Sequence, residues 1–253
     1  MLALKQYYSM ATAGQLTWML APTARLTALL TAAHPVWEAG TGYVDFGRGI
    51  IIAPACAGIN FMIMAFGLAA FCGLLRIRRP APLLAWLVLS LAGAYGLALA
   101  VNAVRIAISM GLYQADIHTA WLTIARVHRL AGIGIYLGAL GLFFRSLAPI
   151  IDGYCLRFDS PDRPERPARL PAWLPLGWYL LGAVGVPTAN LLFRSPTAGY
   201  REHCIMVILS ALALYIGGLL IKWIGHRCAN PAQGASDGER IEKYGAQSAD
   251  CGG

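Results

Sequence analysis

Charged residues are scarce in this 253-residue sequence, at 13% of the total, whereas 58% of its residues are hydrophobic. A soluble domain carries about 25% charged residues, so roughly half of the usual solubilising surface is missing. The apolar residues are grouped into blocks longer than ~18 residues, the length that spans a bilayer as a helix. These features exclude an ordinary soluble protein and predict an all-α fold, a polytopic integral membrane helix bundle.

The sequence also lacks a Cys-x-x-Cys pair. It has six cysteines, but in a membrane protein this number alone does not establish a disulfide framework. A formal net charge of +8 would fit nucleic-acid binding. However, the basic residues lie in short loops between apolar blocks, where they orient membrane proteins. We therefore expect no nucleic-acid partner, and we assign the chain no cofactor and no metal.

Six membrane spans are expected, over residues 10–33, 50–75, 82–103, 127–149, 172–193 and 204–225. Pro22 and Arg25 interrupt the first, and the fifth contains Pro187 and Asn190, which a neighbouring helix has to accommodate. The first span could instead be a cleaved signal sequence, because Lys5 precedes an apolar stretch. Against this alternative, Arg25 lies where the apolar core of a signal should be.

The spans form one expected transmembrane domain, residues 1–228, without an internal repeat. Residues 157–171 are charged and rich in proline, as in a cytoplasmic loop. Residues 229–253 are polar and rich in Gly and Ser, which predicts a disordered cytoplasmic tail.

Basic residues predict the orientation of the bundle. With the N-terminus inside, the inner loops and ends hold 13 Lys and Arg, the outer ones hold 6, and Arg25 lies within a span. The densest inner cluster comprises Arg76, Arg78 and Arg79. Because inner loops of membrane proteins are the more basic ones, both termini are expected to be cytoplasmic.

This orientation brings a thiol, a guanidinium and an imidazole to the outer face. Cys56 lies near the outer start of the second span, Arg105 near the outer end of the third, and His128 near the outer start of the fourth. A cysteine thiolate is a strong nucleophile, and a histidine can carry its proton to a leaving amine. An arginine can stabilise the thiolate or a developing oxyanion. Together the three residue types favour acyl transfer.

Each of these residues also has a structural explanation. A cysteine in a membrane helix is commonly a small filler, an arginine can extend to the interface, and a histidine can simply lie there. Two asparagines add support at lower weight. Asn60 is expected on one helix face with Cys56, and Asn102 on one face with Arg105.

Three strings of residues, in this order on successive spans, resemble the exosortase/archaeosortase family. They are Cys-Ala-Gly-Ile-Asn at 56–60, Asn-x-x-Arg-Ile at 102–106 and His-x-x-x-Gly at 128–132. The longer string 51–61, with Leu-Ala-Pro-Thr at 20–23 and Gly-Thr-Gly-Tyr at 40–43, is most similar to the exosortase K subgroup. The resemblance covers about residues 5–150, and no motif after residue 150 matches.

The resemblance implies a multi-pass cysteine protease and transpeptidase of the bacterial inner membrane, with its active site facing the periplasm. Such enzymes recognise exported, membrane-anchored proteins that end in a short motif, a transmembrane helix and a basic tail. They cut near the motif and pass the new carboxyl end to an acceptor.

Carried over residue by residue, the family's nucleophile is Cys56, its arginine is Arg105 and its general acid/base is His128. His118 and His203 are rival bases, but His118 is not followed by x-x-x-Gly and His203 lies in the unmatched part. The family's usual Cys-Ser-Gly is Cys-Ala-Gly here, so any contact of that serine hydroxyl is lost.

Two other functions remain open. In a transporter or channel component, Arg105, His128 and Glu202 would line a polar path. Few ionisable residues at mid-depth count against this function. In a membrane thiol oxidoreductase, Cys56 and Cys204 would react at the outer face, but the missing Cys-x-x-Cys counts against it.

Overall fold

The structure is a computed structural model that describes residues 8, 11–115, 123–158, 170–185, 188 and 200–229. Within these ranges, the side chains at 124–125, 203, 222 and 225–229 are outside the description. Nearly all of the expected loop 157–171 and tail 229–253 lies outside the described residues. The chain divides into two units, Met1–Ala211 and Leu212–Gly253.

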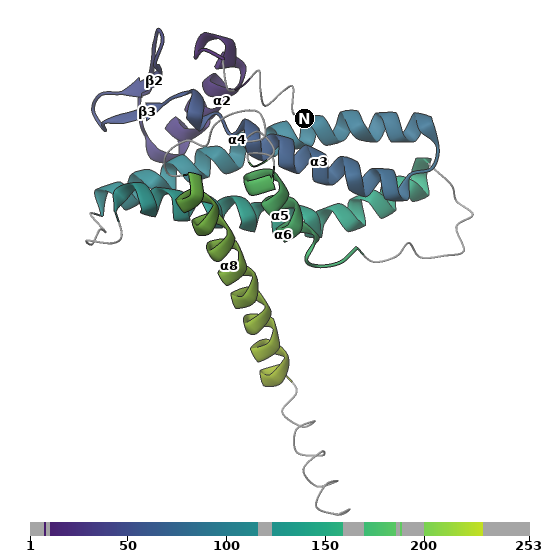
Figure 1. Ribbon diagram of the computed structural model, residues 1–253. Coiled ribbons are helices and arrows are strands. Elements are labelled where there is room, and N and C mark those ends of the chain that lie inside the picture. Colours follow the sequence, from purple (N-terminus) through teal and green to yellow (C-terminus); the bar gives the residue numbers. More distant parts are fainter. Residues whose placement is uncertain are drawn as a thin grey trace, which may run out of the picture. The chain divides into compact units, whose positions relative to one another are not determined.

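Three long helices, α3 (Ile59–Arg76), α4 (Pro80–Gln114) and α5 (Ile124–Phe158), form the centre of the first unit. Each packs against the other two, side by side in Figure 1. Helix α4 begins at a proline, whose fixed φ and missing N–H suit the first turn of a helix. Helices α2 (Thr17–Thr31) and α6 (Leu174–Leu180) pack on this core, and α6 continues as the π-helical turn η3 (Leu181–Gly185).

Four of the six expected spans are confirmed as helices long and apolar enough to cross a membrane. They are Pro54–Arg76, Pro80–Gln114, Arg126–Phe158 and Tyr200–Ile221, the last within helix α8 (Tyr200–Ala229). The first expected span is shorter, because α2 has 15 residues and is about 22 Å long, against ~30 Å for the hydrocarbon layer. In the described part of the fifth, the apolar helix is likewise short, Leu174–Gly185.

The all-α expectation needs a correction, because a small antiparallel sheet lies between α2 and α3 in the sequence. Its strands are β1 (Val36–Glu38), β2 (Gly42–Asp45) and β3 (Ile50–Ile52), in that spatial order. The second expected span began with the Ile-Ile-Ile run that forms β3. A short apolar run of β-branched residues fits a strand as well as a helix, and here pairing with β2 decides.

The side chain of Asp45 holds the loops around this sheet together. Its carboxylate accepts hydrogen bonds from the backbone N–H of His34 at 2.7 Å and of Arg48 at 3.1 Å. The bond from His34, followed by that from Arg48, holds the pKa of Asp45 below its usual value despite burial. The carboxylate therefore stays ionised and keeps the chain before α3 folded back on itself.

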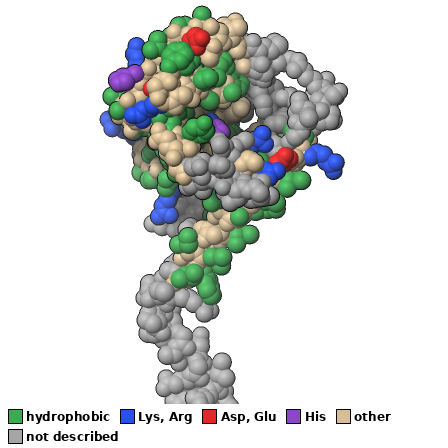
Figure 2. Space-filling model, turned by 90° about the vertical axis from the view of Figure 1, so that its left-hand side faces the viewer, with side chains coloured by type: hydrophobic (Ala, Val, Ile, Leu, Met, Phe, Trp, Pro, Cys, Tyr) green, Lys and Arg blue, Asp and Glu red, His purple; other side chains and the backbone are tan. Residues whose placement is uncertain are grey.

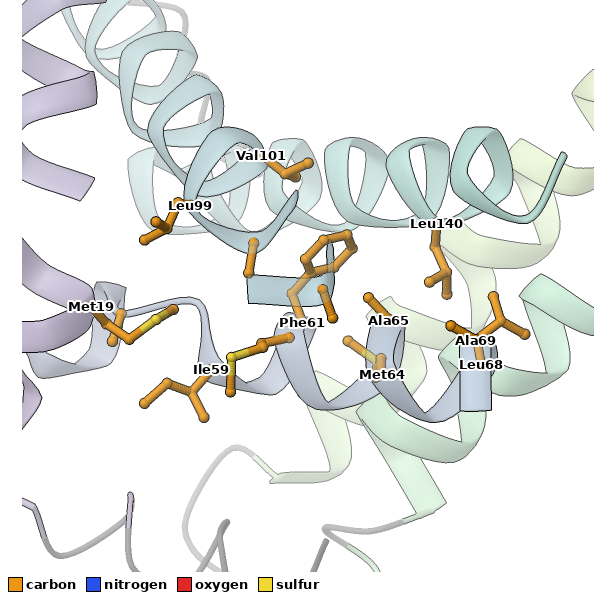
Figure 3. Packing of buried hydrophobic residues seen from close by; sticks show 14 of the residues in the cluster. Met19, Ile59, Phe61, Met64, Ala65, Leu68, Ala69, Leu99, Val101 and Leu140 are labelled. Carbon is orange, nitrogen blue, oxygen red and sulfur yellow. The ribbon is translucent and has the colours of Figure 1, made fainter. Parts of the chain in front are cut away.

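Buried apolar side chains surround α3 on several sides (Figure 3). Phe61 and Leu68 of α3 are fully buried, together with Met19 of α2 and Leu140 of α5. Within a membrane this interdigitation stabilises the bundle mainly by van der Waals contact, since lipid tails are as apolar as the helices. Phe61 also stacks on Tyr136 of α5, with ring centroids 4.9 Å apart, and so connects the core to the polar residues described below.

Polar contacts tie the helices at the end away from Cys56. Arg76, at the end of α3, is buried and forms an ion pair of 2.6 Å with Asp152 of α5. The hydroxyl of Tyr154 donates to the carbonyl of Pro82, in the first turn of α4, at 2.8 Å. Three helices are therefore joined beside the basic cluster that was expected to face the cytoplasm.

The contact between Trp86 and Gly73 provides a test of the packing of α3 on α4. The Trp86 indole donates to the carbonyl of Ala69 at 3.0 Å, and a Cβ at Gly73 would lie 2.2 Å from its Cδ1. We expect Gly73→Ala to destabilise the protein by about 1–3 kcal/mol through overpacking, seen as a lower unfolding midpoint in detergent. Gly93→Ala, at a position with nothing within 4 Å, is the control. Equal midpoints for the two variants would contradict this packing.

Candidate active site

Cys56 lies in the 3-10 turn η2 (Pro54–Cys56), between the sheet and α3. Its backbone N–H donates to the carbonyl of Ala53 at 2.8 Å, and the hydroxyl of Tyr8 donates to the carbonyl of Pro54 at 3.0 Å. Burial raises the pKa of Tyr8, with a smaller contribution from the neighbouring Cys56, so its hydroxyl stays protonated as this donor. The turn thus holds a partly exposed thiol by backbone contacts.

Gly58 separates Cys56 from the helix that follows. Its φ of +73° lies in the left-handed region, which a glycine adopts without the cost that a Cβ brings, and α3 begins at the next residue. The expected sharing of one helix face by Cys56 and Asn60 is therefore wrong, because Cys56 precedes the helix. Asn60 is exposed in the first turn of α3.

Asn102 of α4 is fully buried and faces the Cys56 turn. Its side-chain Nδ2 donates to the backbone carbonyl of Cys56, and its Oδ1 accepts from the hydroxyl of Tyr136 at 3.1 Å. A Cβ at Gly58 would lie 3.1 Å from Asn102 Cγ, so the glycine also leaves room for this amide. The structure thus places Asn102 against the turn that carries the thiol.

Arg105 and His128 are in direct contact. Nη2 of Arg105 lies 2.9 Å from Nε2 of His128, and Nη1 donates to the hydroxyl of Tyr136 at 3.2 Å. Because a guanidinium can only donate, Nε2 is the acceptor, and the neutral imidazole carries its proton on Nδ1. The guanidinium also lies over the Tyr136 ring, 5.3 Å from its centroid.

Gly132, the glycine of His-x-x-x-Gly, makes room for the arginine. A Cβ at this position would lie 3.0 Å from Nε of Arg105. That nitrogen is buried and has no hydrogen-bond partner among the described residues. The spacing of the motif therefore has a structural reason. His128 contacts Nη2 of the guanidinium, and Gly132, one helical turn later, lies beside its Nε.

The structure thus brings Arg105 and His128 together and connects them to the backbone of Cys56 through Tyr136 and Asn102. Within the described ranges, no hydrogen bond of the Cys56 thiol itself is seen, and the link from this group to Cys56 runs through its backbone carbonyl. His118 and the side chain of His203, the rival bases, lie outside the described residues.

The site also contains two tyrosines, Tyr136 and Tyr8, that the sequence motifs do not indicate. Tyr136 follows Gly132 by four residues and His128 by eight, so the helical repeat of α5 places all three on one face, and this spacing could have revealed it. Tyr8 precedes the first expected span, and nothing in its surroundings indicated a contact with Pro54. The end of the bundle that holds these groups faces the viewer in Figure 2, where basic and histidine side chains lie among hydrophobic ones.

Glu202 does not join this group of residues. It forms an ion pair of 3.0 Å with Arg126, in the first turn of α5, from its own position in the first turn of α8. The pair brings the starts of these two helices together.

Comparison with known proteins agrees with the motifs. The model of one family, described as transmembrane exosortase (Exosortase_EpsH), matches residues 3–145, which is more than half of the chain and includes Cys56, Arg105 and His128. No curated protein and no solved structure matches the chain. On the family match, and with the three motifs inside the matched part, the chain belongs to the transmembrane exosortase family.

Proposed function

We propose that this chain is a cysteine transpeptidase that cleaves the C-terminal sorting signal of exported proteins and transfers the new carboxyl end to an acceptor. The observation that carries the proposal is the chain of contacts from His128 through Arg105, Tyr136 and Asn102 to the backbone of Cys56. Within the family, the string at 51–61 is our reason to propose the exosortase K subgroup.

In the proposed reaction, His128 takes the proton of the Cys56 thiol, the thiolate attacks the carbonyl carbon of the scissile peptide, and a C–S bond forms. Arg105 stabilises the oxyanion of the tetrahedral intermediate. The C–N bond then breaks, and the amine leaves with a proton from His128, so that a thioester remains. An acceptor nucleophile attacks the thioester and its proton passes to His128. The C–S bond then breaks, and the Cys56 thiolate regains its proton from His128.

The contact between Arg105 and His128 determines the order of these events. While Nη2 donates to Nε2, the only lone pair of the neutral imidazole is occupied and His128 cannot accept the thiol proton there. When the guanidinium turns from Nε2 towards the substrate carbonyl, the same movement supplies the oxyanion donor and exposes the base. Substrate binding and activation of the thiol are therefore linked in this mechanism.

We further propose a six-span topology with both termini in the cytoplasm and the site at the periplasmic face of the inner membrane. The basic cluster at 76–79 supports this orientation of α3 and α4. The ion pair between Arg126 and Glu202 joins the starts of α5 and α8. This supports a further membrane crossing by the chain that connects these two helices. Because α2 is short, the first crossing also requires residues before Thr17.

Reporter fusions test this topology. A reporter fused after Arg79 should be active only as a cytoplasmic reporter, and one fused after Gln114 only as a periplasmic one. These positions follow α3 and end α4, so the pair reports the direction of one complete helix. The opposite pattern would place Cys56 in the cytoplasm and contradict the proposed function.

The proposed substrates are membrane-anchored proteins with a C-terminal motif, a transmembrane helix and a basic tail. Their helix would lie beside the bundle and hold the scissile bond at the outer interface. Such anchoring removes much of the entropy cost of encounter, so a site with a modest intrinsic rate can act efficiently.

A variant that keeps only Cys56 tests whether one thiol carries the reaction. Its other cysteines are replaced by alanine, at positions 72, 155, 204, 228 and 251. Processing of a co-expressed reporter with a sorting signal encoded in the same genome should continue, measured as a mobility shift. The control also has Cys56 replaced. A folded Cys56-only protein that leaves the reporter uncut would contradict the single-nucleophile mechanism.

The fit of Arg105 against Gly132 gives another prediction. In Gly132→Ala the new Cβ would press on Nε of Arg105 and shift the guanidinium, so we expect turnover to fall about tenfold at normal membrane abundance. Gly138→Ala, in the same helix with nothing within 4 Å, should keep wild-type turnover. Equal turnover of the two variants would show that the position of Arg105 tolerates this displacement.

A further inference from the structure

We propose that Tyr136 is a positioning residue, which links the Arg105 guanidinium to the Cys56 turn through Asn102. The inference rests on the proposed function and extends it to a residue outside the three motifs. No hydrogen bond joins Tyr136 to the Cys56 thiol or to His128 among the described contacts, so its role is exerted through Arg105 and Asn102 rather than on reacting atoms.

The hydrogen bonds around the Tyr136 hydroxyl have a defined direction. The Arg105 guanidinium can only donate, so the hydroxyl accepts that bond, at 3.2 Å. Its single proton is then directed to Oδ1 of Asn102, at 3.1 Å. With Oδ1 so occupied, the amide group of Asn102 points its Nδ2 to the carbonyl of Cys56.

The tyrosine thus fixes which way round the Asn102 amide lies. An asparagine amide can be turned by 180°, which exchanges donor and acceptor, and only its hydrogen bonds distinguish the two orientations. If the amide turned, its Oδ1 would face the Cys56 carbonyl and two acceptors would meet. The Cys56 turn would then lose the bond that connects it to α4.

The ring of Tyr136 is held independently of its hydroxyl. It stacks on Phe61 with an interplanar angle of 18°, and the Arg105 guanidinium lies over the ring, 5.3 Å from its centroid. Tyr136→Phe keeps both ring contacts and removes only the hydroxyl. Asn102, which is fully buried, then has an Oδ1 without its donor, a costly arrangement that turning or displacement of the amide relieves.

The experiment measures reporter turnover and, separately, the rate at which N-ethylmaleimide alkylates Cys56 in the Cys56-only protein. For Tyr136→Phe we expect kcat to fall about tenfold with KM changed less than about twofold, and the alkylation rate to change several-fold. Tyr95→Phe is the matched control. It also removes one hydroxyl of a stacked ring, whose bond to the Trp18 carbonyl at 2.8 Å lies away from the site, and it should change neither quantity.

A double-mutant cycle shows whether Tyr136 acts through Asn102. In an Asn102→Ala background, Tyr136→Phe should have no further effect on the alkylation rate, because the link to the Cys56 turn is already lost. If that background does not accumulate in membranes, Asn102→Ser takes its place. Additive effects, or a Tyr136→Phe variant that behaves like Tyr95→Phe, would overturn the inference. If the proposed function itself were wrong, the Cys56→Ser variant would still process the reporter, and this result is distinct from those above.

Discussion

Cys56→Ser should abolish reporter processing, with a loss on the order of 10³-fold or more. A serine hydroxyl remains protonated where a thiol can ionise, and it is the weaker nucleophile of the two. The turn should survive the exchange, because its recorded hydrogen bonds use the backbone N–H and carbonyl of Cys56 rather than the sulfur. Reporter cleavage and membrane abundance are measured together.

The matched control for this prediction is Cys204→Ser. Cys204 is the other partly exposed cysteine expected at the outer face, and it is the fifth residue of α8. We expect it to keep wild-type processing. If both serine variants were inactive, a thiol oxidoreductase that uses the two cysteines would explain the result better. If neither were affected, the reaction would not depend on a thiol.

His128→Ala is expected to lower turnover by about 10²–10⁴-fold, the usual contribution of a positioned general acid/base. The loss should appear in kcat, since the proton is transferred in the chemical steps and the substrate is held largely by its own anchor. Arg105 keeps its bond to Tyr136 in this variant, so the fold at the site should be retained.

Arg105→Lys separates a catalytic guanidinium from a simple positive charge. The arginine contacts His128 with one terminal nitrogen and Tyr136 with the other, and a lysine ammonium lacks this planar fork. We expect the Arg105→Lys variant to process the reporter more slowly than the wild type when its abundance in the membrane is normal. Near wild-type turnover would return Arg105 to an anchoring role, and if His128→Ala were active as well, a transporter or channel component would replace the enzyme.

Local patterns in the sequence determined much of the architecture. Long apolar blocks predicted helices α3, α4, α5 and α8, because a run of this length has to satisfy its backbone hydrogen bonds internally in a membrane. The helical repeat also placed Asn102 and Arg105 on one face of α4, as the structure has them. Alternation of spans then brought Arg105 and His128 to the same end of the bundle.

Tertiary contacts decided what local patterns left open. The Ile-Ile-Ile run became strand β3 because β2 lies beside it, and Gly58 ended the expected continuity between Cys56 and Asn60. The hydroxyl of Tyr136 lies at the centre of the site because α5 packs on α4. This packing brings Tyr136 into contact with Asn102, 34 positions earlier in the sequence. Composition and periodicity thus determined the membrane class, the long helices and the residue types at one membrane face. Which atoms meet there depends on packing between distant segments, and no local pattern encodes that.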